Sequence, residues 1–122
     1  MERCMIVDGS SVIRKVAKRI LGSNEMLVVE AETGVQALAM ARAQLPDYII
    51  VDEALGDMNS ADLIRQLRQL DQNRSLKIIL CMIQMDLVLM TRAKRAGADE
   101  FLPKPFDRKQ LMQQFSALRH AA

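Results

Sequence analysis

The sequence predicts an α/β domain in which helices cover both faces of a five-stranded, doubly wound parallel sheet. Short apolar runs alternate with longer amphipathic stretches along the 122 residues, which is the pattern of repeated strand–helix units. The predicted strands are mostly continuous apolar runs, and such strands are typically buried beneath helices on both faces of the sheet. No Gly-, Ser- or Pro-rich linker interrupts the pattern, so we expect one domain over residues 1–122.

Five short apolar runs, each bounded by polar residues or glycine, are the predicted strands. A strand needs only a few such residues, whereas a helix needs a longer amphipathic stretch. In chain order the predicted strands cover residues 5–7, 26–29, 48–51, 78–83 and 100–102.

Apolar residues at helical spacing predict a helix after each strand. The second helix begins after Thr33, a good capping residue, and ends before Pro46. Gly97 is a typical end for the fourth helix, which covers residues 86–96, and the fifth begins near Asp107. The apolar residues at helical spacing in the first, second, third and fifth helices are, in that order, Val12, Ile13, Val16, Ala17, Ile20 and Leu21; Leu38 and Ala41; Leu63, Ile64, Leu67 and Leu70; and Leu111, Met112, Phe115 and Leu118. The opposite, polar face of the first helix carries Arg14, Lys15, Lys18 and Arg19.

The charge and the cysteine content exclude several classes of protein. Seventeen Lys and Arg against 15 Asp and Glu give a net charge of +2, without the concentrated basic excess of a nucleic-acid binder. The chain has neither a membrane-length apolar run nor a secretory signal pattern. Cys4 and Cys81 lie in apolar runs, as expected of reduced core thiols in a cytoplasmic protein. The single histidine, His120, leaves no basis for a zinc site or a histidine-based triad. We therefore expect neither nucleic acid nor a membrane as a direct partner.

Two aspartates directly follow predicted strands that we expect to be neighbours. Asp8 follows the first strand and Asp52 the third. In a sheet ordered 2-1-3-4-5 these strands adjoin where the strand order reverses, which is where such sheets bind ligands. Lys104, just past the fifth strand, comes from the same edge. Paired carboxylates with a neighbouring lysine suit Mg²⁺ and a transferring phosphoryl group. Singly, each aspartate is better explained as a turn or cap residue, but their joint placement favours the functional interpretation.

Four segments in this order and spacing resemble the receiver domain of two-component response regulators, of the CheY-like single-domain type. They are residues 5–15, 46–52, 96–101 and 104–106, and the resemblance extends over essentially the whole chain. It implies the flavodoxin-like, CheY-like fold with strand order 2-1-3-4-5. It also implies that the Lys104–Pro105 peptide bond is cis.

The resemblance implies a receiver that takes a phosphoryl group from a histidine kinase or a histidine phosphotransfer protein. Without an appended output domain, such a receiver is expected to signal through contacts with an output protein. The expected contact surface is the face formed by the fourth helix, the fifth strand and the fifth helix. Beyond self-catalysed phosphoryl transfer and autodephosphorylation, we do not expect an enzyme.

Each site residue of the family has a matching position in this sequence. Asp52 matches the phospho-acceptor, which is also a Mg²⁺ ligand, and Asp8 matches the first of two acidic residues after the first strand. Ala54 matches the residue whose backbone carbonyl completes the metal site. Lys104 matches the lysine that pairs with the acceptor carboxylate and then with the phosphoryl oxygens. Phe101 occupies the aromatic switch position.

Gly9 departs from the family pattern, because it stands where the second acidic residue belongs. The remaining protein charges at the metal site are those of Asp8 and Asp52, so we expect weakened Mg²⁺ binding. Glu53 is a candidate replacement ligand, directly or through water. Alternatively it is a solvated surface glutamate, since neighbouring side chains on a strand point to opposite faces.

Met82 is the second departure, at the switch position where the family has Thr or Ser. The usual coupling from phosphate to Phe101 therefore lacks its hydroxyl donor, and the methionine is expected to add bulk beside the acceptor. Met82, Met85 and Met90 are explained either by core packing or by a pliable surface for a partner. Gly56–Asp57 replaces the frequent Pro-Gly pair in the loop after the acceptor, so greater mobility is expected there.

Two other functions are weighed against the receiver. The first is a pseudo-receiver, a phosphorylation-independent protein-binding module in which Gly9 and Met82 mark a decayed site. The second is a flavin-binding electron carrier of the same architecture. A flavin pocket needs aromatic or apolar walls, and the chain has one Tyr, three Phe and no Trp, so the flavin carrier is disfavoured. Phosphorylation of Asp52, and its loss in Asp52→Asn, separates the receiver from the pseudo-receiver.

Overall fold

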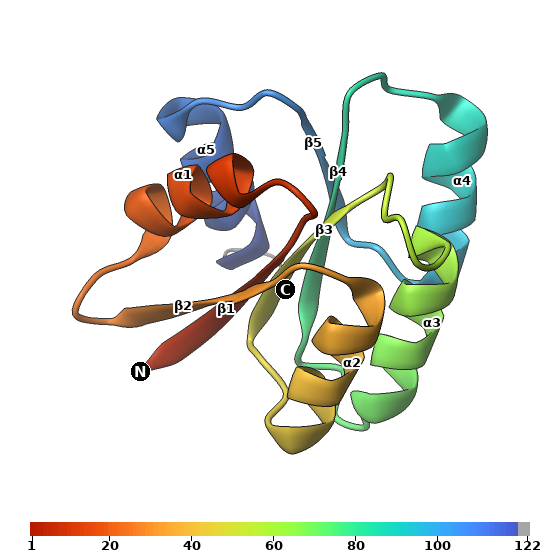
Figure 1. Ribbon diagram of the computed structural model, residues 1–122, viewed down its shortest axis with the longest axis horizontal. Coiled ribbons are helices and arrows are strands. Elements are labelled where there is room, and N and C mark those ends of the chain that lie inside the picture. The colour runs from red at the N-terminus through yellow and green to blue at the C-terminus, as the bar shows by residue number, and fades with distance from the viewer. Residues whose placement is uncertain (120–122) are drawn as a thin grey trace.

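A computed structural model describes residues 1–119 of the chain; His120 lies outside this range. Five parallel strands form one sheet in the order β2-β1-β3-β4-β5, with helices on both faces (Figure 1), so the predicted architecture is confirmed. The elements are β1 (Glu2–Val7), α1 (Ser11–Leu21), β2 (Met26–Ala31), α2 (Gly34–Ala43), β3 (Tyr48–Asp52), α3 (Ser60–Leu70), β4 (Lys77–Met82), α4 (Leu87–Ala96), β5 (Glu100–Pro103) and α5 (Arg108–Arg119).

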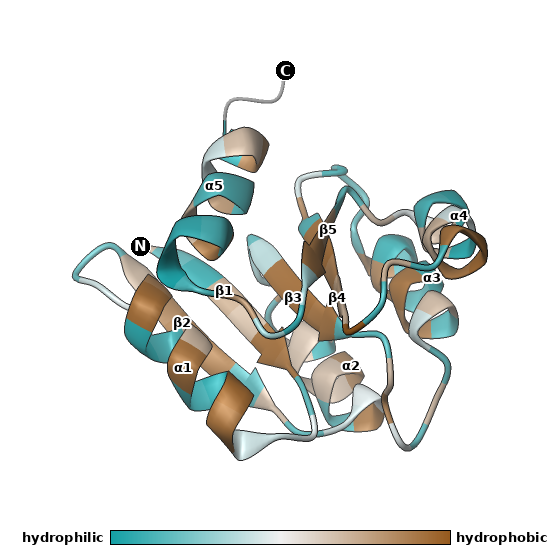
Figure 2. Ribbon diagram, turned by 90° about the horizontal axis from the view of Figure 1, so that it is seen from above, coloured by the Kyte–Doolittle hydropathy of each residue, from teal (hydrophilic) through white to brown (hydrophobic). Residues whose placement is uncertain are grey.

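Side chains that alternate along the central strands fill two hydrophobic cores, one on each face of the sheet. On β4, Ile78, Leu80 and Met82 belong to the core under α2, α3 and α4. Ile79 and Cys81 belong to the core under α1 and α5. Figure 2 shows the two groups of helices on opposite sides of the sheet. The continuous apolar runs therefore mark strands buried on both faces, as predicted.

Every strand differs from its predicted range at one end or both, and two of these ends show that backbone pairing decides where a strand begins or ends. Strand β1 begins at Glu2, since Glu2 and Arg3 pair with β2 ahead of the apolar run. Strand β4 ends at Met82, and the apolar residue Ile83 is 75% exposed. Side-chain polarity is a poor guide at such ends, because the ladder is formed by backbone groups.

Capping residues at the helix termini explain where the helices begin and end. Thr33 accepts a hydrogen bond from the Gln36 amide at the start of α2, as predicted. Asp86 accepts from two amides at the start of α4, and Gly97 ends that helix with a φ of 125°, where glycine is favoured. Within residues 1–119 no helix combines the length and the apolarity needed to cross a membrane.

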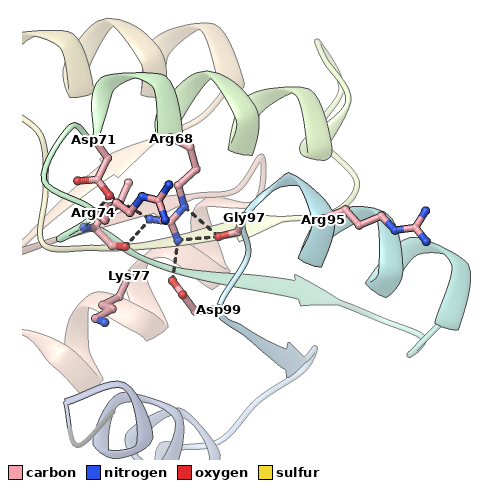
Figure 3. A pocket seen from close by; sticks show the side chains of 8 residues that line it. Arg68, Asp71, Arg74, Lys77, Arg95, Gly97 and Asp99 are labelled. Carbon is pink, nitrogen blue, oxygen red and sulfur yellow. Dashed lines mark hydrogen bonds and ion pairs between the residues drawn. The ribbon is translucent and has the colours of Figure 1, made fainter. Parts of the chain in front are cut away.

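One partly buried arginine joins α3 to the starts of β4 and β5 (Figure 3). All five N–H donors of Arg68 are used: the carbonyl oxygen of Gly97 accepts from Nε at 3.0 Å and from a terminal nitrogen at 2.6 Å, and Leu76, Asp71 and Asp99 accept the other three hydrogen bonds. A β-carbon at Gly97 would lie 2.7 Å from Cγ of Arg68. We call this set the Arg68 network. It lies at the amino ends of β4 and β5, the edge of the sheet opposite Asp52.

Candidate functional site at the carboxyl edge of the sheet

Three charged side chains from distant parts of the sequence meet at the carboxyl ends of the strands. Asp8 follows β1, Asp52 ends β3, and Lys104 follows β5. Nζ of Lys104 lies 2.9 Å from Oδ2 of Asp8 and 3.3 Å from Oδ2 of Asp52. Both aspartates are buried, and the Lys104–Pro105 bond is cis. The predicted juxtaposition of Asp8, Asp52 and Lys104 is therefore present.

Lys104 is the cation that balances the two carboxylates. Burial by itself would lower the pKa of Lys104, but the hydrogen bond to Asp8 and the charges of Asp52 and Asp8 outweigh burial and raise it. The ammonium is therefore protonated at neutral pH and offsets the repulsion between the aspartates. Its shorter contact is to Asp8, although the resemblance implies pairing with the acceptor Asp52.

Arg14 is part of the site's support, which the sequence analysis missed. It donates a 2.6 Å hydrogen bond to the backbone carbonyl of Asp8 and pairs through Nε with Glu30 at 3.1 Å. Its side chain is only 13% exposed, whereas the amphipathic pattern places it on the solvated face of the first helix. The Asp8 carboxylate is held separately, because Oδ1 accepts a 2.8 Å hydrogen bond from the Ser10 amide. No local signal distinguishes Arg14 from the neighbouring lysines.

The Asp52 carboxylate opens into a pocket of about 320 Å³. Glu53, Ala54 and Lys104 line it beside Asp52, and apolar walls come from the β4–α4 loop and α4. The Ala54 amide lies 3.4 Å from Oδ1 of Asp52. The donor chemistry of Asp8 and Asp52 fits Mg²⁺, which needs only one or two carboxylates and otherwise keeps its water.

Glu53 and Gly9 decide how strong a metal site these residues can form. Within residues 1–119 no three acidic, histidine or cysteine side chains gather closely enough to hold an ion, so Glu53 is not placed as a third carboxylate beside Asp8 and Asp52. At Gly9 an added β-carbon would meet no atom within 4 Å. An acidic side chain would therefore fit at this position, and glycine there lowers the negative charge of the site without any gain in packing.

Met82 is a core residue, and it does not line the acceptor pocket. Its side chain is 2% exposed and packs in the core under α2, α3 and α4. The pocket wall is formed instead by Ile83 and Leu89, so Met82 adds its bulk to the core rather than to the pocket wall. Phe101 packs partly buried against the same core as Met82. Met90 also packs against that core, whereas Met85 is 45% exposed.

Comparison with known proteins agrees with this geometry. Residues 4–116 match the family described as response regulator receiver domain. Chemotaxis protein CheY of Bacillus subtilis is 30% identical over 112 residues, covering 91% of this chain and 92% of that protein. The response regulator MprA of Mycobacterium ulcerans is 30% identical over 116 residues; these cover 95% of this chain and 49% of MprA, so the chain spans about half of that relative.

The solved structure of chemotaxis protein CheY4 from Vibrio cholerae has the same fold. It superposes with a TM-score of 0.89 at 26% identity, over 96% of this chain and 98% of that one. Fold, site geometry and family match agree, and the chain belongs to the response regulator receiver domain family.

Proposed function

We propose that this chain is a single receiver domain that accepts a phosphoryl group on Asp52. The observation that carries the proposal is the placement of the Lys104 ammonium 2.9 Å from Asp8 and 3.3 Å from Asp52. In this arrangement Asp52 would be the carboxylate nucleophile and Lys104 the cation for the phosphoryl oxygens, while Asp8 and Asp52 together would form part of a metal site. Receiver domains of this family interact with histidine kinases or phosphotransfer proteins, and we infer that one of these is the donor.

The proposed transfer uses a carboxylate oxygen of Asp52 as the nucleophile. It forms a bond to phosphorus while the bond from phosphorus to the donor's imidazole nitrogen breaks, and the imidazole takes up a proton. Asp8, Asp52 and the Ala54 carbonyl would hold Mg²⁺, which when bound neutralises charge on the phosphoryl oxygens. Lys104 would follow those oxygens. Water attack on the aspartyl phosphate would reverse the modification, so any catalysis is confined to the chain's own phosphoryl group.

The output surface is proposed on the face formed by α4, β5 and α5. Leu87 and Val88 are exposed apolar residues at the start of α4, and Arg92 and Arg95 share a surface groove with them. An exposed apolar group beside cations suits a protein partner. The buried free thiols Cys4 and Cys81 support a cytoplasmic location.

A pseudo-receiver is the second candidate, and two observations favour it. Gly9 leaves the metal site with the carboxylates of Asp8 and Asp52, and Met82 places an apolar side chain in the core at the switch position. In this reading the same fold binds its partner without phosphorylation.

An NMR titration with Mg²⁺, followed by Mg²⁺ with beryllofluoride as an aspartyl-phosphate mimic, separates the two candidates. The receiver predicts saturable shifts at Asp8, Asp52 and Lys104, and their loss in Asp52→Asn. Shifts that reach Phe101 would show that the switch couples without a hydroxyl at Met82. No response at millimolar Mg²⁺, in wild type or variant, would overturn the receiver and leave the pseudo-receiver.

A further inference from the structure

The loop that follows the acceptor strand is bound to the amino end of a different helix. Residues 53–59 connect β3 to α3, and Asp57 lies in this loop. Its Oδ1 accepts a 3.0 Å hydrogen bond from the Gly34 amide, and its Oδ2 accepts a 2.9 Å hydrogen bond from the Val35 amide. Both donors are first-turn amides of α2, which the helix leaves without internal partners. We call this pair of hydrogen bonds the Asp57–α2 contact.

Packing next to these hydrogen bonds fixes the loop on α2 as well. A β-carbon at Gly34 would overlap the sulfur of Met58, and it would lie 3.5 Å from Oδ1 of Asp57. Met58 also packs against the core between the sheet and α2, α3 and α4. The missing side chain at Gly34 thus makes the space in which the loop rests.

Asp57 is ionised in this contact at neutral pH. The hydrogen bonds from the Gly34 and Val35 amides lower its pKa below the ordinary aspartate value. A carboxylate at a helix amino terminus is also favoured by the helix dipole. Because the folded pKa is lowered, the contribution of Asp57 to stability is present above an ordinary aspartate pKa of about 4 and is lost as pH falls through the lowered value.

The Asp57–α2 contact adds a polar restraint to a loop whose Leu55 and Met58 also pack against the core. Gly56 has no neighbour within 4 Å of an added β-carbon, and glycine gives the backbone its greatest freedom. Yet Ala54, in the same loop, has its amide 3.4 Å from Oδ1 of Asp52. Greater mobility of this loop is predicted because Gly56–Asp57 replaces the frequent Pro-Gly pair. The Asp57–α2 contact opposes that mobility.

We propose that Asp57 is a positioning residue that orders the loop through α2 and so keeps Ala54 beside Asp52. It thereby supplies the restraint that a proline at position 56 would give. The consequence for Mg²⁺ rests on the proposed function, because it is the Ala54 carbonyl that would complete the metal site. The ordering of the loop does not rest on it.

Asp57→Ala and Thr33→Ala form a matched pair for the test. Both remove a cap from the amino end of α2, since Thr33 accepts from the Gln36 amide, but only Asp57 lies in the loop. Amide hydrogen exchange is measured by NMR at Ala54 and along α2. We expect exchange at Ala54 to become about tenfold faster in Asp57→Ala, the change that corresponds to loss of a capping side chain. In Thr33→Ala the Ala54 rate stays unchanged.

Gly56→Pro in the Asp57→Ala background is the rescue variant. It should return Ala54 exchange towards the wild-type rate, because proline removes backbone freedom from the loop. Mg²⁺ titration of the same proteins should give about tenfold weaker binding in Asp57→Ala, the lower end of the cost of losing an outer-shell partner, and recovery in the double variant.

Each result decides a separate part of the proposal. Unchanged Ala54 exchange in Asp57→Ala, or equal changes in the two capping variants, would overturn the positioning role. Faster exchange with unaltered Mg²⁺ affinity would overturn its link to the metal site. If wild type binds no Mg²⁺, the proposed function fails, and the Ala54 exchange rates still decide whether Asp57 orders the loop.

Discussion

At the scale of single residues, Gly9 limits the negative charge of the proposed metal site. An aspartate fits there, because an added β-carbon meets nothing within 4 Å. Gly9→Asp is expected to bind Mg²⁺ at least tenfold more tightly, since one further negative charge at about 4 Å from the divalent ion contributes about 2 kcal/mol even when fully solvated. The dissociation constant is measured by NMR titration with Mg²⁺.

Gly9→Asn is the control for this change, because asparagine has the size of aspartate without its charge. We expect it to bind Mg²⁺ much as wild type does. Equal gains in the two variants would show that loss of backbone freedom at position 9, rather than charge, limits the site.

Met82 is the second residue-scale test, because threonine at this position restores the hydroxyl of the family pattern. The methionine is 2% exposed in the core, so Met82→Thr empties buried volume and also buries a hydroxyl. We expect a loss of about 3 kcal/mol in the free energy of unfolding, measured in urea. Met85→Thr, at a position 45% exposed, should stay within about 0.5 kcal/mol of wild type. Similar losses in both would contradict the core position of Met82.

At the scale of elements, the Arg68 network joins helix α3 to strands β4 and β5. Lysine at position 68 offers three donors where the guanidinium uses five, so Arg68→Lys loses at least two hydrogen bonds of the network, although Asp71 keeps those from the Ser75 and Leu76 amides. We expect the free energy of unfolding to fall by about 3 kcal/mol, because each lost hydrogen bond from a charged donor costs about 1.5 kcal/mol. Urea unfolding monitored by circular dichroism measures this.

Arg65→Lys on the same helix is the matched control. Arg65 pairs with Asp62 where both side chains are exposed, and exposed pairs contribute little. A change below about 0.5 kcal/mol is expected. If the two lysine variants are equally stable, the Arg68 network does not stabilise the joint between these elements.

At the scale of the whole molecule, the Arg68 network lines a surface groove at the amino edge of the sheet. Lys77 and Arg95 border that groove, but Figure 3 shows their side chains directed away from the guanidinium. Arg68 itself has no donor left for a ligand.

A second link across the whole molecule joins β1, β3 and α5 through the only tyrosine. The Tyr48 hydroxyl donates to Glu2 at 2.9 Å and accepts from Arg119 at 3.3 Å. Burial, opposed by Arg119 and reinforced by Glu2, raises the pKa of Tyr48. With no Trp in the chain, tyrosinate absorbance should report Tyr48 alone, titrating above the ordinary value of about 10.

Because the folded pKa of Tyr48 is raised, its contribution to stability is present below about pH 10 and is lost as pH rises past that value. Urea unfolding at increasing pH should show this loss, and Tyr48→Phe should lack it. Glu2→Gln should lower the Tyr48 pKa towards the ordinary value, whereas Glu32→Gln, an exposed change elsewhere, should not. Identical titration of the folded and urea-unfolded protein would contradict the link.

The sequence by itself determined the fold class, the strand order and the meeting of Asp8, Asp52 and Lys104. The fold class and the approximate ends of the strands follow from hydrophobic periodicity and from the ends of apolar runs, which depend on residues close together in the chain. The strand order is what the resemblance to the receiver family implies. A parallel sheet then brings the carboxyl ends of its strands to one edge, wherever those strands lie in the sequence. The motif match to the receiver family identified the same residues independently.

Only the tertiary structure decided which polar side chains support the site and which join distant elements of the fold. Arg14 bonds across 16 positions to Glu30, Asp57 across 23 to Gly34, and Arg68 across 31 to Asp99. In sequence each of them is an ordinary charged residue on a helix or in a loop. Their roles depend on which backbone groups the packed helices and strands leave without partners, and those groups come together only when distant elements are in contact.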